Sequence, residues 1–238
     1  MNNGLILSLI SGLSTIIGSI FIFIKFKRVG ELINFFLSFS IGIMIMISLF
    51  ELMPSSIPII MNKYSYLGVI LIIQTFVLGY LTVFMINKYL DNENSLYRIG
   101  IISFITLVMH NIPEGIIVYM STFTNSKLCF KLVLSIILHN IPEGILISLP
   151  LYYSKKSRGY ALLMTLISGL SEFVGALLSY MFFGRGISDS LLSFILLFVS
   201  GLMISLSLNE ILKQIKYNKY MLYGSILSIG VVLLILMI

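Results

Sequence analysis

The chain has 238 residues, of which 58% are apolar and only 10% charged, and its mean hydropathy is +1.08. These values exclude an ordinary water-soluble globule, because apolar stretches of about twenty residues, each long enough to cross a bilayer as a helix, follow one another along the chain. The formal net charge of +6 does not indicate nucleic-acid binding, because the basic residues stand mainly in short connections, where they set membrane topology.

The order of apolar stretches predicts an all-α integral membrane protein with eight transmembrane helices, and we expect residues 1–238 to form one transmembrane domain. With the N-terminus outside, eleven of the fifteen Lys and Arg residues fall in inner connections and four in outer ones. Because cytoplasmic connections are rich in these residues, we expect a multi-pass protein of the cell membrane with both termini extracytoplasmic. The expected spans are approximately 4–24, 32–53, 66–87, 98–121, 128–152, 159–183, 190–211 and 219–238.

Two patterns in the first spans recur later in the chain. Ile-Ser-Gly-Leu-Ser at 10–14 recurs at 167–171, and Gly-x-Met-x-x-x-Ser-Leu-x-Glu at 42–51 recurs at 201–210, so the offsets are 157 and 159 residues. Spans one and six are an odd number of crossings apart, so the repeated units run in opposite directions. Such an inverted repeat is typical of secondary transporters whose site lies near the membrane midplane.

Five of the nine acidic residues lie within the expected spans. Each is costly there, at ~2.5 to 3.5 kcal/mol for an acidic group at a helix centre. Glu51 and Glu210 lie near the ends of their expected spans, where a carboxylate that reaches the membrane surface explains them equally well. Glu114, Glu143 and Glu172 lie well inside and indicate an ion site. The candidate residues of a polar pathway are Glu51, Glu210, Met44 and Ser168.

Spans four and five each contain His-Asn-Ile-Pro-Glu-Gly, at 110–115 and 139–144. Positions i and i+4 share a helix face, so each span presents an imidazole and a carboxylate one turn apart, close enough to bind one cation. The asparagine of each motif, Asn111 or Asn140, adds an amide oxygen on the adjacent face. The proline removes one backbone hydrogen bond, and we expect each span to kink or loosen at its motif.

The two motifs begin 29 residues apart on consecutive spans, which must run antiparallel as neighbours. Both lie near mid-membrane, so their faces can converge, and Glu172 on the sixth span can complete the cluster. A divalent cation would neutralise the crowded carboxylates. Imidazole, carboxylate and amide ligands without thiolates suit Zn²⁺, Fe²⁺, Mn²⁺, Co²⁺ or Cd²⁺.

On these residues the chain resembles the ZIP (Zrt/Irt-like) metal transporters, in particular the prokaryotic ZupT/GufA-like branch. The matching motifs are His-Asn-x-Pro-Glu-Gly on the fourth span, His-x-x-Pro-Glu-Gly on the fifth, and Ser-Gly-x-x-Glu at 168–172 on the sixth. The sequence departs from some members at Asn140, where they have Asp, and in the connection 88–97, which lacks a His-rich stretch.

The resemblance implies a three-plus-two-plus-three arrangement of spans with a pseudo-twofold inverted repeat. It also implies elevator-like motion of spans one, four, five and six, and a binuclear site. The implied ligands of one metal are His110, Glu114, His139 and Glu143. The implied ligands of the second metal are Asn111, Glu114, Asn140, Glu143 and Glu172, and Asn140 leaves the occupancy of this position open.

We therefore expect a secondary transporter that moves divalent transition metals, zinc foremost, into the cytoplasm. The metal is cargo and no resident cofactor is expected; the partners are metal ions and the bilayer. The oligomeric state stays open, with a homodimer as one arrangement. The alternative is an intramembrane metal-dependent hydrolase, because His and Glu ligands can also activate water. It is less favoured because the chain has no HExxH segment and no third histidine, so we do not expect an enzyme.

Overall fold

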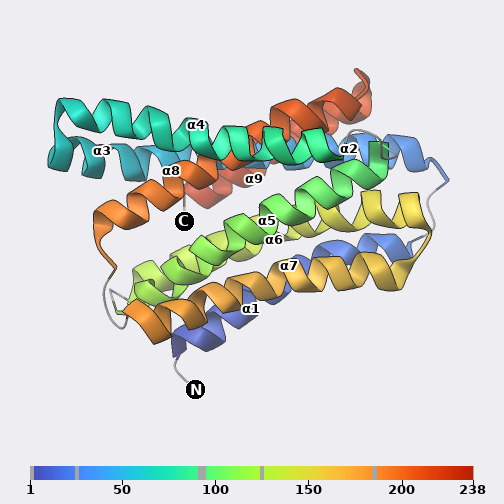
Figure 1. Ribbon diagram of the computed structural model, residues 1–238. Helices are drawn as coiled ribbons and strands as arrows, with labels where there is room; N and C mark the ends of the chain where they lie inside the picture. Colours follow the sequence, from blue (N-terminus) through green and yellow to red (C-terminus); the bar gives the residue numbers. More distant parts are fainter. Residues whose placement is uncertain (1–2, 25–26, 91–94, 124–125, 184–186, 238) are drawn as a thin grey trace.

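The computed structural model describes residues 3–24, 27–90, 95–123, 126–183 and 187–237, and the regular elements in these ranges are helices (Figure 1). Lys25 and Arg185, which contribute to the topology count, lie outside the described residues, as does the side chain of Lys127. Part of the 88–97 connection, at 91–94, also lies outside them.

Within the described ranges, nine α-helices are labelled in chain order, and several continue into a turn of 3-10 or π helix. The first four are α1 (Asn3–Gly18, then 3-10 to Phe23), α2 (Val29–Ile47, then a π turn Ser48–Leu52), α3 (Met53–Tyr64) and α4 (Tyr66–Tyr89). The others are α5 (Ser95–Ser121), α6 (Ser126–Lys155), α7 (Arg158–Leu178, then a π turn Ser179–Phe183), α8 (Asp189–Leu206, then a π turn Ser207–Ile211 and 3-10 Leu212–Gln214) and α9 (Lys219–Met237).

Seven helical segments in the described part of the chain are long and apolar enough to cross a membrane, and an eighth, Lys219–Ile235, is apolar but shorter. The prediction of an all-helical, multi-pass membrane protein is confirmed at this level. The apolar side chains that remain exposed, such as Leu67, Ile70 and Ile73 on α4, suit contact with hydrocarbon.

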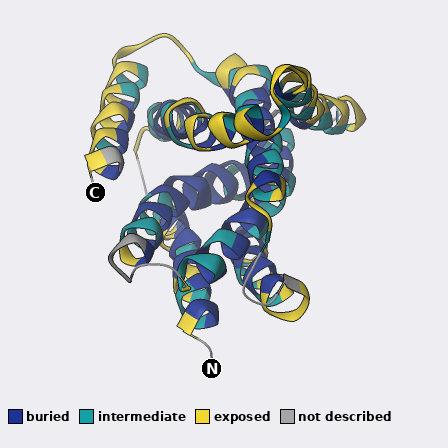
Figure 2. Cartoon of the chain, turned by 90° about the vertical axis from the view of Figure 1, so that its left-hand side faces the viewer, coloured by how far each residue is buried: buried dark blue, intermediate teal, exposed yellow. Residues whose placement is uncertain are grey.

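The helices form two groups (Figure 1). The site bundle consists of α1, α5, α6 and α7, which pack closely on one another, and the flanking bundle consists of α2, α3, α4, α8 and α9. The bundles meet where α2 contacts α6 and α5 contacts α8. Figure 2 shows buried residues where helices face one another and exposed residues on the outward faces of the peripheral helices. The site bundle therefore provides an interior in which polar groups are shielded from lipid.

The second span is longer than the sequence indicated. We expected it to end near residue 53, but the helix continues without a break from Val29 to Tyr64. Pro54, the second residue of α3, lacks an N–H, and the π turn Ser48–Leu52 that precedes it is a local adjustment of the kind by which a membrane helix continues through a proline. Glu51 consequently lies in the middle of a long helix, and its expected position near a span end is wrong.

The helices of the site bundle approach closely at the glycine that ends each hexapeptide motif. A Cβ at Gly115 would overlap the carbonyl oxygen of Glu172 on α7, and a Cβ at Gly144 would overlap that of Thr15 on α1. Glycine has no side chain, so it lets the neighbouring backbone come this near. The close approach holds α5 against α7 and α6 against α1, which fixes the motif side chains relative to these helices.

Gly115→Ala should therefore force α5 and α7 apart, because the new methyl group meets backbone that cannot rotate away. Overpacking of this kind costs roughly 1–3 kcal/mol. We expect a lower midpoint of thermal unfolding in detergent. Gly159→Ala is the matched control, because a Cβ at Gly159 meets no atom within 4 Å. Equal stability of Gly115→Ala and Gly159→Ala would contradict the packing account.

Candidate metal centre

The two hexapeptides lie on antiparallel neighbours, α5 and α6, and the α-helix runs through the proline in both. The four histidine and glutamate side chains of the motifs are buried, with exposed fractions of 1% for His110, 6% for Glu114, 4% for His139 and 2% for Glu143. Four titratable groups buried in one helical bundle carry a desolvation cost that structural residues rarely incur. Their burial is thus an indication of function.

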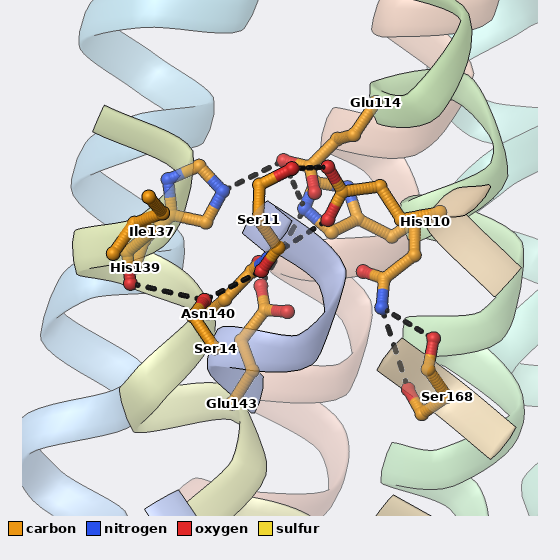
Figure 3. A network of polar contacts seen from close by, with 11 residues as sticks. Ser11, Ser14, His110, Glu114, Ile137, His139, Asn140, Glu143 and Ser168 are labelled. Atoms are coloured by element: carbon orange, nitrogen blue, oxygen red, sulfur yellow. Dashed lines mark hydrogen bonds and ion pairs between the residues drawn. The ribbon is translucent and has the colours of Figure 1, made fainter. Parts of the chain in front are cut away.

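The imidazoles of both helices converge on one carboxylate (Figure 3). Glu114 Oε1 lies 3.0 Å from His110 Nε2 and 2.7 Å from His139 Nε2. Glu143 Oε1 lies 3.5 Å from His110 Nε2. His110, Glu114 and His139 each offer one ligand atom, and these three atoms lie within 4.8 Å of one another. A single transition-metal ion could be held at this spacing.

The motif asparagines are anchored in matching ways. Asn111 Nδ2 donates to the carbonyl oxygen of Ser168 on α7 at 2.8 Å, and Asn140 Nδ2 donates to that of Ser11 on α1 at 2.9 Å. Because a carbonyl can only accept, these bonds fix which end of each amide is nitrogen. The amide oxygens are therefore the ends left for another partner.

Glu172 of α7 is fully buried beside this group. Its Oε2 accepts a hydrogen bond from Asn140 Nδ2 at 2.9 Å, and its Oε1 accepts one from the hydroxyl of Ser11. Ser8, one turn earlier on α1, donates to the backbone carbonyl of Glu172 at 3.0 Å. The structure thus brings the third span-interior glutamate to the motifs, and α1 supplies contacts to it.

Several buried ligand-type oxygens at the centre have no hydrogen-bond partner among the described residues. They are Asn111 Oδ1, Glu114 Oε2, Asn140 Oδ1 and Glu143 Oε2. A buried polar atom left unpaired costs about 1–3 kcal/mol, more for a charged one, and such atoms call for a missing water or ion. These amide and carboxylate oxygens lie next to imidazole nitrogens. A divalent cation could be coordinated by both kinds of atom at once.

A cavity of about 220 Å³ borders the centre. Its wall contains His110, Glu114 and His139 together with Glu51 and Ser55 of the second span. The rest of the wall is mainly apolar and includes Ile117 near the C-terminal end of α5, Leu132 near the start of α6 and Leu192 near the start of α8. Glu51 therefore shares one cavity with both histidines and with Glu114.

The other three candidate pathway residues lie elsewhere. Glu210, fully buried in the π turn after α8, pairs with Arg98 near the start of α5, with 3.3 Å between Oε2 and Nε. Met44 is packed in the apolar core and is not part of the cavity wall. Ser168 is buried and contacts Asn111 through its carbonyl oxygen. Of this group, Glu51 alone borders the cavity.

Three residues that contact one of the candidate residues or the motif backbone were not singled out from the sequence. Ser11 belongs to the repeated Ile-Ser-Gly-Leu-Ser segment, so a comparison with Ser168 could have indicated it. Arg98 could have been noticed as a cation at the start of a span that contains an acidic motif. Ser40, which donates to the carbonyl oxygen of Pro142 at 3.2 Å, carries no sequence signal that we recognise.

Fold and site together define a class: a polytopic helical membrane protein with a buried His/Glu centre suited to a divalent cation. A family model described as ZIP Zinc transporter matches residues 91–237. The zinc transporter ZupT of Enterobacter sp. (strain 638) is 32% identical over 256 residues, covering 98% of both chains. ZupT of Escherichia coli O127:H6 (strain E2348/69 / EPEC) is 32% identical over 248 residues, covering 97% of this chain and 95% of that protein.

The chain belongs to the ZIP family and falls with its ZupT-like branch. The resemblance noted on the motifs is therefore confirmed over nearly the whole length. Members of this family are transporters and not enzymes, so the hydrolase alternative is not favoured.

Proposed function

We propose that this protein is a secondary transporter that carries divalent transition-metal cations, with zinc as the main cargo, through the centre on α5 and α6. The observation that carries the proposal is the convergence of His110 Nε2 and His139 Nε2 on Glu114 Oε1, inside a membrane-spanning bundle. The relatives are named as zinc transporters, which supports zinc as cargo. The same ligand types would accept Fe²⁺, Mn²⁺, Co²⁺ and Cd²⁺.

The proposed ligand sets follow the two motifs. His110, Glu114, His139 and Glu143 would hold one metal. The second would be held by Asn111, Glu114, Asn140, Glu143 and Glu172. Within the part of the chain that the structure describes, the Oε2 atoms of Glu114 and Glu143 have no hydrogen-bond partner, which supports their role as bridges. The amide oxygens of the motif asparagines likewise have none there, which supports the second position.

The proposed direction is uptake across the cell membrane into the cytoplasm, with both termini extracytoplasmic. The bias of basic residues then places the α5–α6 connection outside, and the cavity lies at that end of α5. At the other end of α5, the Arg98–Glu210 pair joins α5 to the turn after α8. The position of the cavity supports entry of the metal from outside.

The proposed motion is an elevator-like displacement of the site bundle against the flanking bundle, in a single transport domain built as a three-plus-two-plus-three inverted repeat. Matched contacts support the repeat: Asn111 bonds to Ser168 as Asn140 bonds to Ser11, and 168 and 11 differ by the offset of 157 residues. The π turns that hold Glu51 and Glu210 also fall at corresponding places. A homodimer is compatible with this arrangement but is not required by it.

Purified protein in proteoliposomes tests the function. With Zn²⁺ outside and a fluorescent zinc indicator inside, we expect saturable zinc entry that protein-free vesicles lack, because the centre offers ligands that replace the ion's hydration shell. Parallel measurements with Cd²⁺ and Mg²⁺, with and without a pH gradient, would rank the metals and detect proton coupling. Zinc entry no faster than in protein-free vesicles would contradict the proposal, as would equal rates for Zn²⁺ and Mg²⁺.

A further inference from the structure

Glu172 differs from the motif glutamates in that protein donors already hold both of its carboxylate oxygens. Asn140 Nδ2 donates to Oε2 at 2.9 Å, and the Ser11 hydroxyl donates to Oε1. The donors come from two different helices, α6 and α1, and all three side chains are buried. By contrast, one oxygen each of Glu114 and Glu143 has no hydrogen-bond partner among the described residues.

The Ser11 hydroxyl has a choice of acceptors, which makes its bond to Glu172 informative. It also lies 3.0 Å from the carbonyl oxygen of Leu7 and 3.2 Å from that of Ser8, the usual acceptors for a serine within a helix. A hydroxyl donates a single proton, and the ionised carboxylate of a metal-binding glutamate is a stronger acceptor than a backbone carbonyl. The carboxylate of Glu172 is therefore the favoured acceptor, and α1 is tied to the centre through one side chain.

The internal repeat sharpens the contrast between Ser11 and its counterpart. Ser168 stands 157 residues after Ser11, and the backbone carbonyls of both accept from a motif asparagine. The same offset relates Glu172 to Thr15, so only one of the two repeat units has a carboxylate here. Both serines therefore accept a hydrogen bond from a motif asparagine through the backbone carbonyl. The bond from a serine hydroxyl to a carboxylate is made by Ser11.

We propose that Ser11 is a positioning residue for the second metal position: its hydroxyl, with the amide of Asn140, fixes the Glu172 carboxylate so that the remaining lone pairs face an incoming divalent cation. Each carboxylate oxygen keeps a lone pair after accepting one hydrogen bond. Hydrogen bonds from such outer partners orient a metal-binding carboxylate, and their loss typically costs 10–100-fold in metal affinity. The inference rests on the proposed function and adds α1 to the machinery of the site.

Ser11→Ala removes the hydroxyl and leaves the carbonyl that anchors Asn140. Equilibrium binding of Cd²⁺ to the purified full-length protein in nanodiscs should show 10–100-fold weaker binding of one of two ions, with the other unchanged. The KM for Cd²⁺ uptake in proteoliposomes should rise. Ser8→Ala is the matched control, because Ser8 lies on the same helix and bonds to Glu172 through the backbone carbonyl only. It should bind Cd²⁺ as the wild type does.

A double-mutant cycle separates positioning from packing. If Ser11 acts through the carboxylate, Ser11→Ala should have no further effect on Cd²⁺ affinity in a Glu172→Gln background. Wild-type affinity in Ser11→Ala, an equal loss in Ser8→Ala, or an undiminished loss in the Glu172→Gln background would each overturn the proposal. Failure of the proposed function looks different: the wild type itself would then neither bind nor transport the ion.

Discussion

Glu114→Gln is expected to abolish metal uptake, with a fall of at least ~100-fold in rate, while the protein still inserts in the membrane. Glu114 Oε1 is the atom on which both imidazoles converge, at 3.0 and 2.7 Å, and Oε2 has no hydrogen-bond partner among the described residues. Glutamine preserves the shape of the side chain and removes its charge. Because loss of an outer partner already costs 10–100-fold in affinity, loss of a shared ligand charge should cost more.

The measurement is the initial rate of Zn²⁺ entry into proteoliposomes, normalised to the amount of inserted protein. Glu31→Gln is the matched control. It removes the same charge from the start of α2, where Glu31 is paired 3.4 Å from Arg28 at the surface, and it should transport normally. Glu143→Gln should resemble Glu114→Gln. Normal zinc accumulation in both motif variants would refute the assignment of the centre.

The convergence of the motif side chains could be predicted from the sequence because its geometry is largely local. The spacing of His110 and Glu114 is fixed by one turn of helix, and the same holds for His139 and Glu143. The short connection between the two spans then requires an antiparallel neighbour, which brings the two faces together. Little information beyond helix periodicity and connection length was needed, and the distances among these groups agree with the prediction.

The course of the second span could not be predicted in the same way. Pro54 and Pro58 follow Glu51 closely, and a proline inside a helical pattern normally marks its end. In the structure, the π turn at 48–52 precedes Pro54 and the helix continues to Tyr64. Backbone groups cannot be left unpaired in hydrocarbon, so a membrane helix that meets a proline tends to adjust locally rather than stop.

Contacts between residues far apart in the sequence could not be predicted from the sequence patterns either. The hydroxyl of Ser11 reaches a residue 161 positions away, and whether it does so depends on how α1 lies against α7. The pairing of Glu210 with Arg98 depends likewise on the meeting of the two bundles. For Glu210, a carboxylate that reaches the membrane surface was one of two equal interpretations of the sequence, and the structure buries its side chain fully. Such contacts arise from tertiary packing, which periodicity does not encode.

Arg98→Met should destabilise the protein by roughly 3–5 kcal/mol, the usual cost of removing one partner of a buried ion pair. The Glu210 side chain has no exposed surface and that of Arg98 is 17% exposed, so water cannot readily replace the lost cation. Methionine retains most of the length and apolar contact of the arginine stem. For a chain of this size, the loss should lower the midpoint of thermal unfolding in detergent by roughly 6–20 °C.

The double variant Arg98→Met/Glu210→Met tests whether the charge of Glu210 is the cause. Because a well-packed apolar pair can replace a buried ion pair at little cost, the double variant should regain most of the stability that Arg98→Met loses. Further loss in the double variant would mean that packing of the arginine stem, and not the ion pair, stabilises this contact.

The pair joins α5 of the site bundle to the turn after α8 of the flanking bundle, far from the histidines along α5. If the bundles move against each other during transport, this contact must open. The double variant should then bind Cd²⁺ at the centre with unchanged affinity but transport it at an altered rate, because the balance between the two positions of the site bundle has shifted.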